Sequence, residues 1–379
     1  DLSRAIPLHE QTLADRERIL GTHHPDTLNS RNNLATAYRE AGDLSRAIPL
    51  HEATLADFER ILGTHHPATL NSRNNLAGAY QEAGDLSRAA PLHEATLADF
   101  ERILGTDHPD TLTSRSNLAT AYQEAGDLSR AIPLYEQTLA DRERILGTHH
   151  PDTLTSRSNL AGAYQEAGDL SRAIPLYEQT LADRERVLGT HHPDTLTSRS
   201  NLATAYREAG DLSRAIPLHE ATLADRERIL GTHHPDTLNS RNSLAGAYQE
   251  AGDLSRAIPL HEATLADRER ILGTYHPATL NSRNNLASAY YAAGDLDRAT
   301  SLLEATLADF ERVLGTHHPA TLNSRNNLAT AYQDAGDLSR AIPLYEATLA
   351  DSERALGTDH PVTRAVRRNL KAAIERMKA

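Results

Sequence analysis

The sequence of 379 residues contains no cysteine, which excludes disulfides, thiolate metal ligands and cysteine nucleophiles. It also lacks any apolar run near the length of about 18 residues that a membrane-spanning helix needs, so we expect no membrane partner. All but two of the 39 basic residues are arginine, which indicates a GC-rich, bacterial coding sequence. The net charge of −13 disfavours nucleic acid, because phosphate binding needs a basic face. We therefore expect a cytoplasmic bacterial protein.

What the sequence has instead is a repeat of 42 residues. The turn Ala41-Gly42-Asp43-Leu44 returns with its glycine at Gly84, Gly126, Gly168, Gly210, Gly252, Gly294 and Gly336. A second mark, Leu20-Gly21-Thr22, returns with its glycine at Gly63, Gly105, Gly147, Gly189, Gly231, Gly273, Gly315 and Gly357. A fixed period of this length is typical of a solenoid, in which each unit buries its apolar face by stacking on its neighbours. The pattern favours an extended binding surface over an active site.

Each repeat contains the signals of two helices. Apolar residues recur at three- and four-residue spacing over Leu28–Ala41, and Pro25 suits the first helical turn, where a missing N–H is not needed. Gly42 is the expected stop, and Asp43 is the expected N-cap of a second helix over Leu44–Leu62. The unit is therefore predicted to be an antiparallel helical hairpin, and the fold to be all-α.

The repeat also predicts how the chain is organised. We expect one solenoid over 1–379, made of a lone second helix plus loop (1–24), eight helical hairpins (25–360) and a C-terminal capping helix (361–379). The chain starts in the middle of a unit and without methionine, which suggests a piece of a longer protein. Its first helix would expose Leu2, Ile6 and Leu13, so end-to-end self-association is an expected partner interaction.

The repeat resembles the tetratricopeptide repeat. The family pattern of leucine, small residue, tyrosine and alanine occurs here at Leu34, Ala35, Tyr38 and Ala47. Arg31 stands in place of the family's tryptophan, and His51 stands in place of its later aromatic residue. The period and the elements Leu62-Gly63, His66-Pro67 and Asn74-Asn75-Leu76-Ala77 are most similar to the units of kinesin light chains and bacterial multi-repeat proteins. The resemblance implies a protein-binding fold whose first helices line a concave groove. We therefore expect a right-handed α-solenoid, or superhelix, of antiparallel hairpins.

A ladder of asparagines lies on the polar face of the first helices. Its members are Asn33, Asn75, Asn117, Asn159, Asn201, Asn285, Asn327 and Asn369, with Ser243 as the break. An amide can donate and accept, so such a ladder can pair with the main chain of an extended peptide, as the resemblance implies. The alternative is that these amides only satisfy groups between adjacent helices.

Other polar or large residues on the same face complete the candidate groove. They are Asn29, Asn71, Arg39, Gln81, Gln123 and Tyr291. Interface energy concentrates in arginines and aromatics, which are few here, so we expect weak contacts summed over many units. The seventh unit departs most from the others, with Tyr290-Tyr291 and Leu303, and is either a patch of different specificity or neutral drift.

Histidine pairs are the one metal-like feature of the sequence. They recur at His23-His24, His65-His66, His149-His150, His191-His192, His233-His234 and His317-His318. We expect the second histidine to start a helix and the first to lie on the surface, so no metal or cofactor is predicted; an ion bridging neighbouring units is the alternative. Histidines such as His51 exchange with tyrosine, as core residues do, and the charged run Asp15–Arg18 is expected to be a solvated face.

No distinctive catalytic constellation interrupts the repeat, so we expect no enzyme. The sequence favours a protein-interaction scaffold that holds an extended peptide or partner segment in its concave groove. Two alternatives stay open: the C-terminal sensor or regulatory array of a larger bacterial signalling protein, and a structural spacer or self-assembling array.

Overall fold

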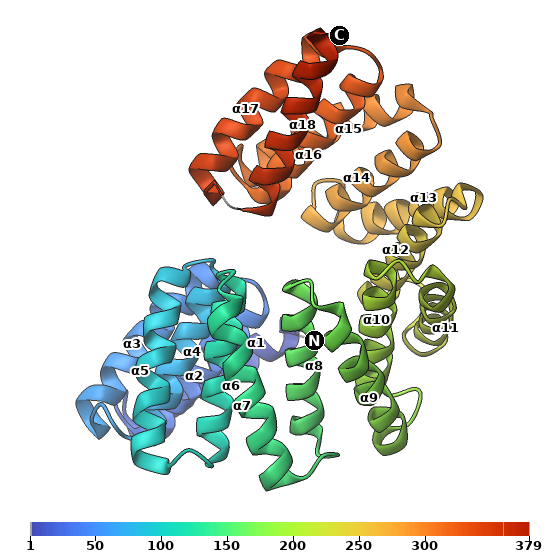
Figure 1. The fold of residues 1–379 in the computed structure, drawn as a ribbon. Coiled ribbons are helices and arrows are strands. Elements are labelled where there is room, and N and C mark those ends of the chain that lie inside the picture. The colour runs from blue at the N-terminus through green and yellow to red at the C-terminus, as the bar shows by residue number, and fades with distance from the viewer. Residues whose placement is uncertain (1, 359, 379) are drawn as a thin grey trace. The chain divides into compact units, whose positions relative to one another are not determined.

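A computed structural model describes residues 2–358 and 360–378, apart from the side chains of residues 2 and 3. These residues form eighteen helices and no strand (Figure 1). The helices are α1 (Leu2–Leu20), α2 (Pro25–Glu40), α3 (Leu44–Leu62), α4 (Pro67–Glu82), α5 (Leu86–Leu104), α6 (Pro109–Glu124), α7 (Leu128–Leu146), α8 (Pro151–Glu166), α9 (Leu170–Leu188), α10 (Pro193–Glu208), α11 (Leu212–Leu230), α12 (Pro235–Glu250), α13 (Leu254–Leu272), α14 (Pro277–Ala292), α15 (Leu296–Leu314), α16 (Pro319–Asp334), α17 (Leu338–Leu356) and α18 (Pro361–Lys378). The predicted all-α solenoid of hairpins is confirmed. No helix in the described part of the chain combines the length and the apolar character needed to cross a bilayer.

The hairpin signals act where the sequence places them. His24 caps α2, its ring accepting a hydrogen bond from the main-chain N–H of Asp26, and the next residue is a proline in the first turn. The helix therefore starts earlier and ends one residue sooner than the predicted Leu28–Ala41. Gly42 follows with φ of +78° and donates its N–H to Arg39 O, the left-handed C-terminal turn that glycine favours. Asp43 then caps α3 through the N–H of Arg46, as predicted.

The chain divides into two compact units, Asp1–Gly189 and Thr190–Ala379. In each unit the second helix of a hairpin packs on the first helix of the next, as α3 does on α4 and α11 on α12. Successive first helices also touch one another, as α2 and α4 do in the first unit and α12 and α14 in the second. Second helices of successive hairpins contact one another less than the first helices do. Each unit therefore curves with its first helices on the inner side. We call the surface made by the first helices the inner face of the unit.

The repeat position of Phe58 is buried in several copies that hold arginine there. The sequence predicted that one of these arginines, Arg16, lies on a solvated helix face. Phe58 is 1% exposed, and the equivalent Arg142 is only 8% exposed, donating to Ser156 Oγ at 2.7 Å. Arg16, in the run predicted to be solvated, likewise donates to Ser30 Oγ at 2.8 Å. The prediction of a solvated face is therefore wrong at this position, because the arginine reaches from the helix surface into the hairpin junction.

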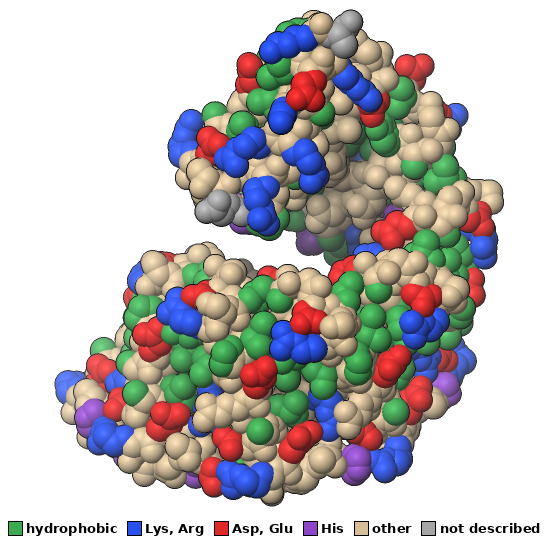
Figure 2. Space-filling view, in the orientation of Figure 1, with side chains coloured by type: hydrophobic (Ala, Val, Ile, Leu, Met, Phe, Trp, Pro, Cys, Tyr) green, Lys and Arg blue, Asp and Glu red, His purple; other side chains and the backbone are tan. Residues whose placement is uncertain are grey.

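The first helix of the chain buries more apolar surface than expected. Ile6 and Leu13 pack against the cluster of Leu34, Tyr38 and Ala47, so the prediction that α1 exposes them is wrong. The large exposed apolar side chains described on α1 are Leu8, Ile19 and Leu20, and the side chain of Leu2 lies outside those described. At the other end, α18 buries Val366 and Ala373, and basic side chains gather over the C-terminal helices (Figure 2).

Candidate binding surface

The predicted asparagine ladder lies on the inner faces of the two units. Asn33 and Asn327 are exposed, and the members between them are partly buried: Asn75, Asn117, Asn159, Asn201 and Asn285. Among the described residues, the side chains of Asn75, Asn117 and Asn159 make no hydrogen bond within the chain. Asn285 differs, because its Nδ2 donates to Asn242 Oδ1 at 2.9 Å. The ladder thus contains both free amides and amides that join neighbouring helices.

A cavity of about 300 Å³ opens on the inner face of the first unit. Its lining comes from α2, α4, α5 and α6: Arg39, Asn74, Asn75, Gly78, Gln81, Glu82, His93, Asn117, Thr120 and Glu124. Four of the predicted site residues, Arg39, Asn75, Gln81 and Asn117, are therefore brought together. Asn29 and Asn71 are exposed on α2 and α4 but do not line this cavity.

An equivalent cavity, also of about 300 Å³, opens on the inner face of the second unit. It is lined by Arg207, Asn242, Gly246, Gln249, Glu250, His261, Asn285 and Ser288. Each of these residues lies four repeats after its counterpart in the first unit. The same local arrangement therefore forms in both units, from different copies of the repeat.

Glycine allows the arginine to lie across the floor of both cavities. A Cβ added to Gly78 would approach Arg39 Nη1 to 3.0 Å, and one added to Gly246 would approach Arg207 Nη1 to 3.3 Å. Elsewhere this position of the repeat is threonine or serine, except for Gly162 and, in the last helix, Ala372. The pairing of arginine with a glycine 39 residues later is a signal of the cavity that the sequence interpretation missed.

The arginine is held at one edge by a carboxylate. Arg39 Nε lies 3.4 Å from Glu82 Oε1, and Arg207 Nε lies 3.7 Å from Glu250 Oε1. In other repeats a different side chain contacts the same carboxylate position: Gln123 Nε2 donates to Glu166 Oε2 at 2.8 Å. The predicted anchors at Arg39 and Gln123 thus contact the next hairpin, and their contact with a peptide stays a prediction.

A buried histidine also lines each of the two cavities, His93 in the first unit and His261 in the second. His93 and His261 are 1% and 2% exposed, and burial lowers the pKa of each to about 4, so both are neutral at pH 7. His93 Nδ1 lies 2.8 Å from Asn74 Oδ1, which places the ring proton on Nδ1 and leaves Nε2 as an acceptor without a partner. The prediction that these histidines are core residues is confirmed, but their place beside the cavities was not foreseen.

The histidine pairs occupy the predicted structural positions. The second member caps the following first helix, as His66 does for Ala68 N at 3.2 Å. The first member is exposed and faces a carboxylate, as His65 Nδ1 does 3.2 Å from Asp99 Oδ1. Within the described residues, no group of three or more histidine, aspartate or glutamate side chains is placed to hold a metal ion.

Two sequence models, both described as tetratricopeptide repeat, match the chain. One matches residues 1–56, 242–311 and 284–352, and the other matches 69–110, 111–152, 153–194 and 195–236. The chain belongs to the tetratricopeptide-repeat family. The resemblance inferred from the residue pattern is confirmed, and no curated protein gives a significant match.

Solved structures give further likenesses. A putative kinesin light chain with nearly identical TPR-like repeats, from Podosopora anserina, is 36% identical over 54% of this chain and 97% of its own, with a TM-score of 0.48. BtubC (BKLC) from P. vanneervenii is 25% identical over 62% and 94%, with a TM-score of 0.52. The apo form of the quorum sensor NprR from B. thuringiensis is 15% identical over 92% and 96%, with a TM-score of 0.64, and shares the fold.

Proposed function

We propose that this tetratricopeptide-repeat protein is an interaction scaffold whose inner faces bind an extended peptide or a segment of a partner protein. The observation that carries the proposal is the recurrence of one cavity in both units, with every lining residue of the second cavity at a position that also lines the first. The first unit's cavity is lined by residues of three successive hairpins, from α2, from α4 and α5, and from α6, which suits a ligand that runs along several hairpins of that unit. The family, whose repeats typically mediate protein interactions, supports the same class of partner.

The chemistry of the first unit's cavity suits main-chain recognition. Asn75 and Asn117 line the first unit's cavity and offer amides that make no hydrogen bond within the described part of the chain. A peptide main chain presents matching donors and acceptors at regular spacing. A single amide hydrogen bond contributes only about 1 kcal/mol, so affinity requires several repeats at once.

The experiment begins with a phage-displayed library of random 12-residue peptides selected against the full chain. Affinities of the selected peptides are then measured by fluorescence anisotropy. The triple variant Asn75→Ala, Asn117→Ala, Asn159→Ala is expected to weaken peptides bound to the first unit by at least about tenfold, because three hydrogen bonds are lost. The matched control removes three exposed amides of second helices, Gln11→Ala, Gln137→Ala and Gln179→Ala, and is expected to change affinity less than twofold.

The structural spacer and the helix-joining ladder make different predictions for the same experiment. A structural spacer predicts no enriched peptide, and an asparagine ladder that only joins helices predicts equal affinities for the two triple variants. A sensor array of a larger signalling protein would use the same inner face for its ligand. We assign this scaffold role to a bacterial cytoplasm and assign it no catalytic step.

A further inference from the structure

The seventh hairpin, α14 and α15, lacks the polar side chain that the other hairpins place beneath the inner face. The position of His51 holds histidine or tyrosine in eight copies of the repeat and leucine only at Leu303. In the hairpin of α6 and α7, Tyr135 fills this place: its hydroxyl lies 2.8 Å from Thr120 Oγ1 and donates to Gln123 Oε1 at 3.0 Å. Leu303 is 3% exposed and offers no hydroxyl or imidazole there.

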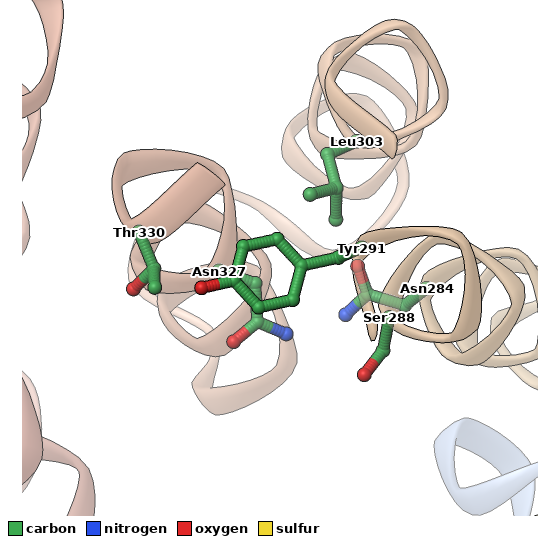
Figure 3. Close-up of a pocket in the computed structure, with 6 residues that line it drawn as sticks. All are labelled: Asn284, Ser288, Tyr291, Leu303, Asn327 and Thr330. Carbon is green, nitrogen blue, oxygen red and sulfur yellow. The ribbon is translucent and has the colours of Figure 1, made fainter. Parts of the chain in front are cut away.

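A cavity of about 140 Å³ lies beside Leu303. Two of its lining residues, Ser288 and Tyr291, are the counterparts of Thr120 and Gln123, which Tyr135 contacts in its own hairpin. The cavity is lined by Asn284, Ser288, Tyr291, Leu303, Asn327 and Thr330. Figure 3 shows the ring of Tyr291 reaching from α14 toward Asn327 and Thr330 of α16, with Leu303 of α15 on the ring's other side. The walls are therefore a leucine and an aromatic ring, with amides and hydroxyls around them.

The tyrosine wall is held in place from outside the cavity. The Tyr291 hydroxyl donates to Asp334, which accepts a second bond from Arg376 Nη1 at 2.6 Å. Burial, with the neighbouring Asp334, raises the pKa of Tyr291 to about 12, so the hydroxyl stays protonated and keeps donating. The ring is thereby fixed as a surface for a ligand to pack against.

Size and charge define what this cavity can take. An apolar protein cavity of about 150 Å³ accepts a group the size of benzene, whereas drug-sized ligands and cofactors need roughly 300 Å³ or more. No residue lining the cavity is ionised, in contrast to the neighbouring cavity, which contains Arg207 and Glu250. The geometry therefore suits one uncharged, mostly apolar side chain. At its edge, Asn327 is exposed and free of hydrogen bonds within the described chain, so it can pair with the ligand's main chain.

We propose that this cavity is a specificity pocket that takes one branched aliphatic side chain, such as leucine, from a peptide bound to the inner face of the second unit. The proposal rests on the proposed peptide-binding function and adds the side-chain chemistry that is recognised. It assigns the departures of the seventh repeat, Leu303 and Tyr291, to selectivity.

The test uses peptides selected from the random 12-residue library against the full chain. Peptides bound to the second unit are expected to share one aliphatic residue, whose replacement by alanine weakens binding by about 60-fold, because three buried carbons are lost. The double variant Tyr291→Gln, Leu303→Tyr recreates the pair Gln123 and Tyr135 and should fill the pocket. It is expected to bind the leucine and alanine peptides equally weakly.

Two further variants keep the test decisive. Ser288→Thr adds one methyl group, using the residue found at Thr120, and is expected to shift the preference from leucine toward valine or alanine. His219→Tyr places tyrosine in another hairpin of the same unit, next to Thr204 as Tyr135 is next to Thr120, and should leave the leucine preference intact.

The failures of the two proposals can be told apart. Enriched peptides without a common aliphatic residue, or an unchanged leucine preference in both Ser288→Thr and the double variant, would overturn the pocket alone. An absence of enriched peptides would overturn the proposed function and the pocket with it.

Discussion

At the scale of single residues, the position of His51 decides the character of the inner face. The side chain at this position is buried under the first helices. Histidine, tyrosine and leucine there place an imidazole, a phenol or an aliphatic group beside the inner face. The sequence predicts that the position is buried, because its residues exchange as core residues do. It could not show that His93 and His261 lie beside cavities, because the arginine, glycine and asparagines that complete them come from other helices.

Burial of these histidines makes stability depend on pH. Burial, with Arg207 nearby, lowers the pKa of His219 in the folded chain to about 4, below the ordinary value of 6.5. The unfolded chain therefore binds the proton first, so this contribution to stability is present above pH 6.5 and is lost as the pH falls toward 4. Carboxylates whose pKa is lowered, such as Asp225, become protonated only at lower pH, so their contribution to stability is lost below this range.

The variant His219→Tyr tests this contribution. Between pH 7 and pH 5, the free energy of unfolding of the variant should fall by about 2 kcal/mol less than that of the natural chain, because one titrating site is removed. Urea denaturation followed by circular dichroism at the two pH values measures the difference. Equal losses in the two proteins would show that the folded state does not keep His219 neutral.

At the scale of helices, the capping residues in the sequence predicted where each helix starts and ends. They did not predict which side chains of different helices contact one another. Proline, glycine and aspartate fixed the starts and ends of the helices to within about a turn, because caps depend on adjacent residues. The arginine in place of the family's tryptophan was noted, but its partners were not. Arg115 of α6 donates to Asp141 of α7 at 2.7 Å and to Glu101 of α5 at 3.3 Å, so one guanidinium joins three helices.

Removing this guanidinium should destabilise the array. The side chain of Arg115 is 1% exposed, and Arg115→Ala leaves the mostly buried Asp141 without its main partner. We expect a loss of about 3 kcal/mol in the free energy of unfolding, as for other broken buried ion pairs. The control Arg102→Ala removes an exposed partner of Asp99 and should have little effect. Urea denaturation compares the two, and similar stabilities would contradict the role of Arg115 as a joint.

At the scale of the whole molecule, the period predicted the hairpins and their stacking within each unit. It did not predict the division at Gly189, because the repeat continues through that point without a change in sequence pattern. A single solenoid over 1–379, its right-handed sense and end-to-end association stay predictions. The two equivalent cavities arise because arginine and glycine recur together four repeats apart, which a period of one repeat does not reveal.

The proposed binding of peptides to the inner faces is tested most directly by locating a bound peptide on the chain. Photoreactive benzoylphenylalanine is placed at Gln81 or Gln249, which line the two inner cavities, and at Gln137 or Gln179, which are exposed on second helices. Irradiation with a selected peptide, followed by mass spectrometry, identifies the positions that cross-link. Peptide binding to the inner faces predicts cross-links from Gln81 or Gln249 and none from the other two positions. Cross-links from Gln137 or Gln179 without any from the inner faces would contradict it.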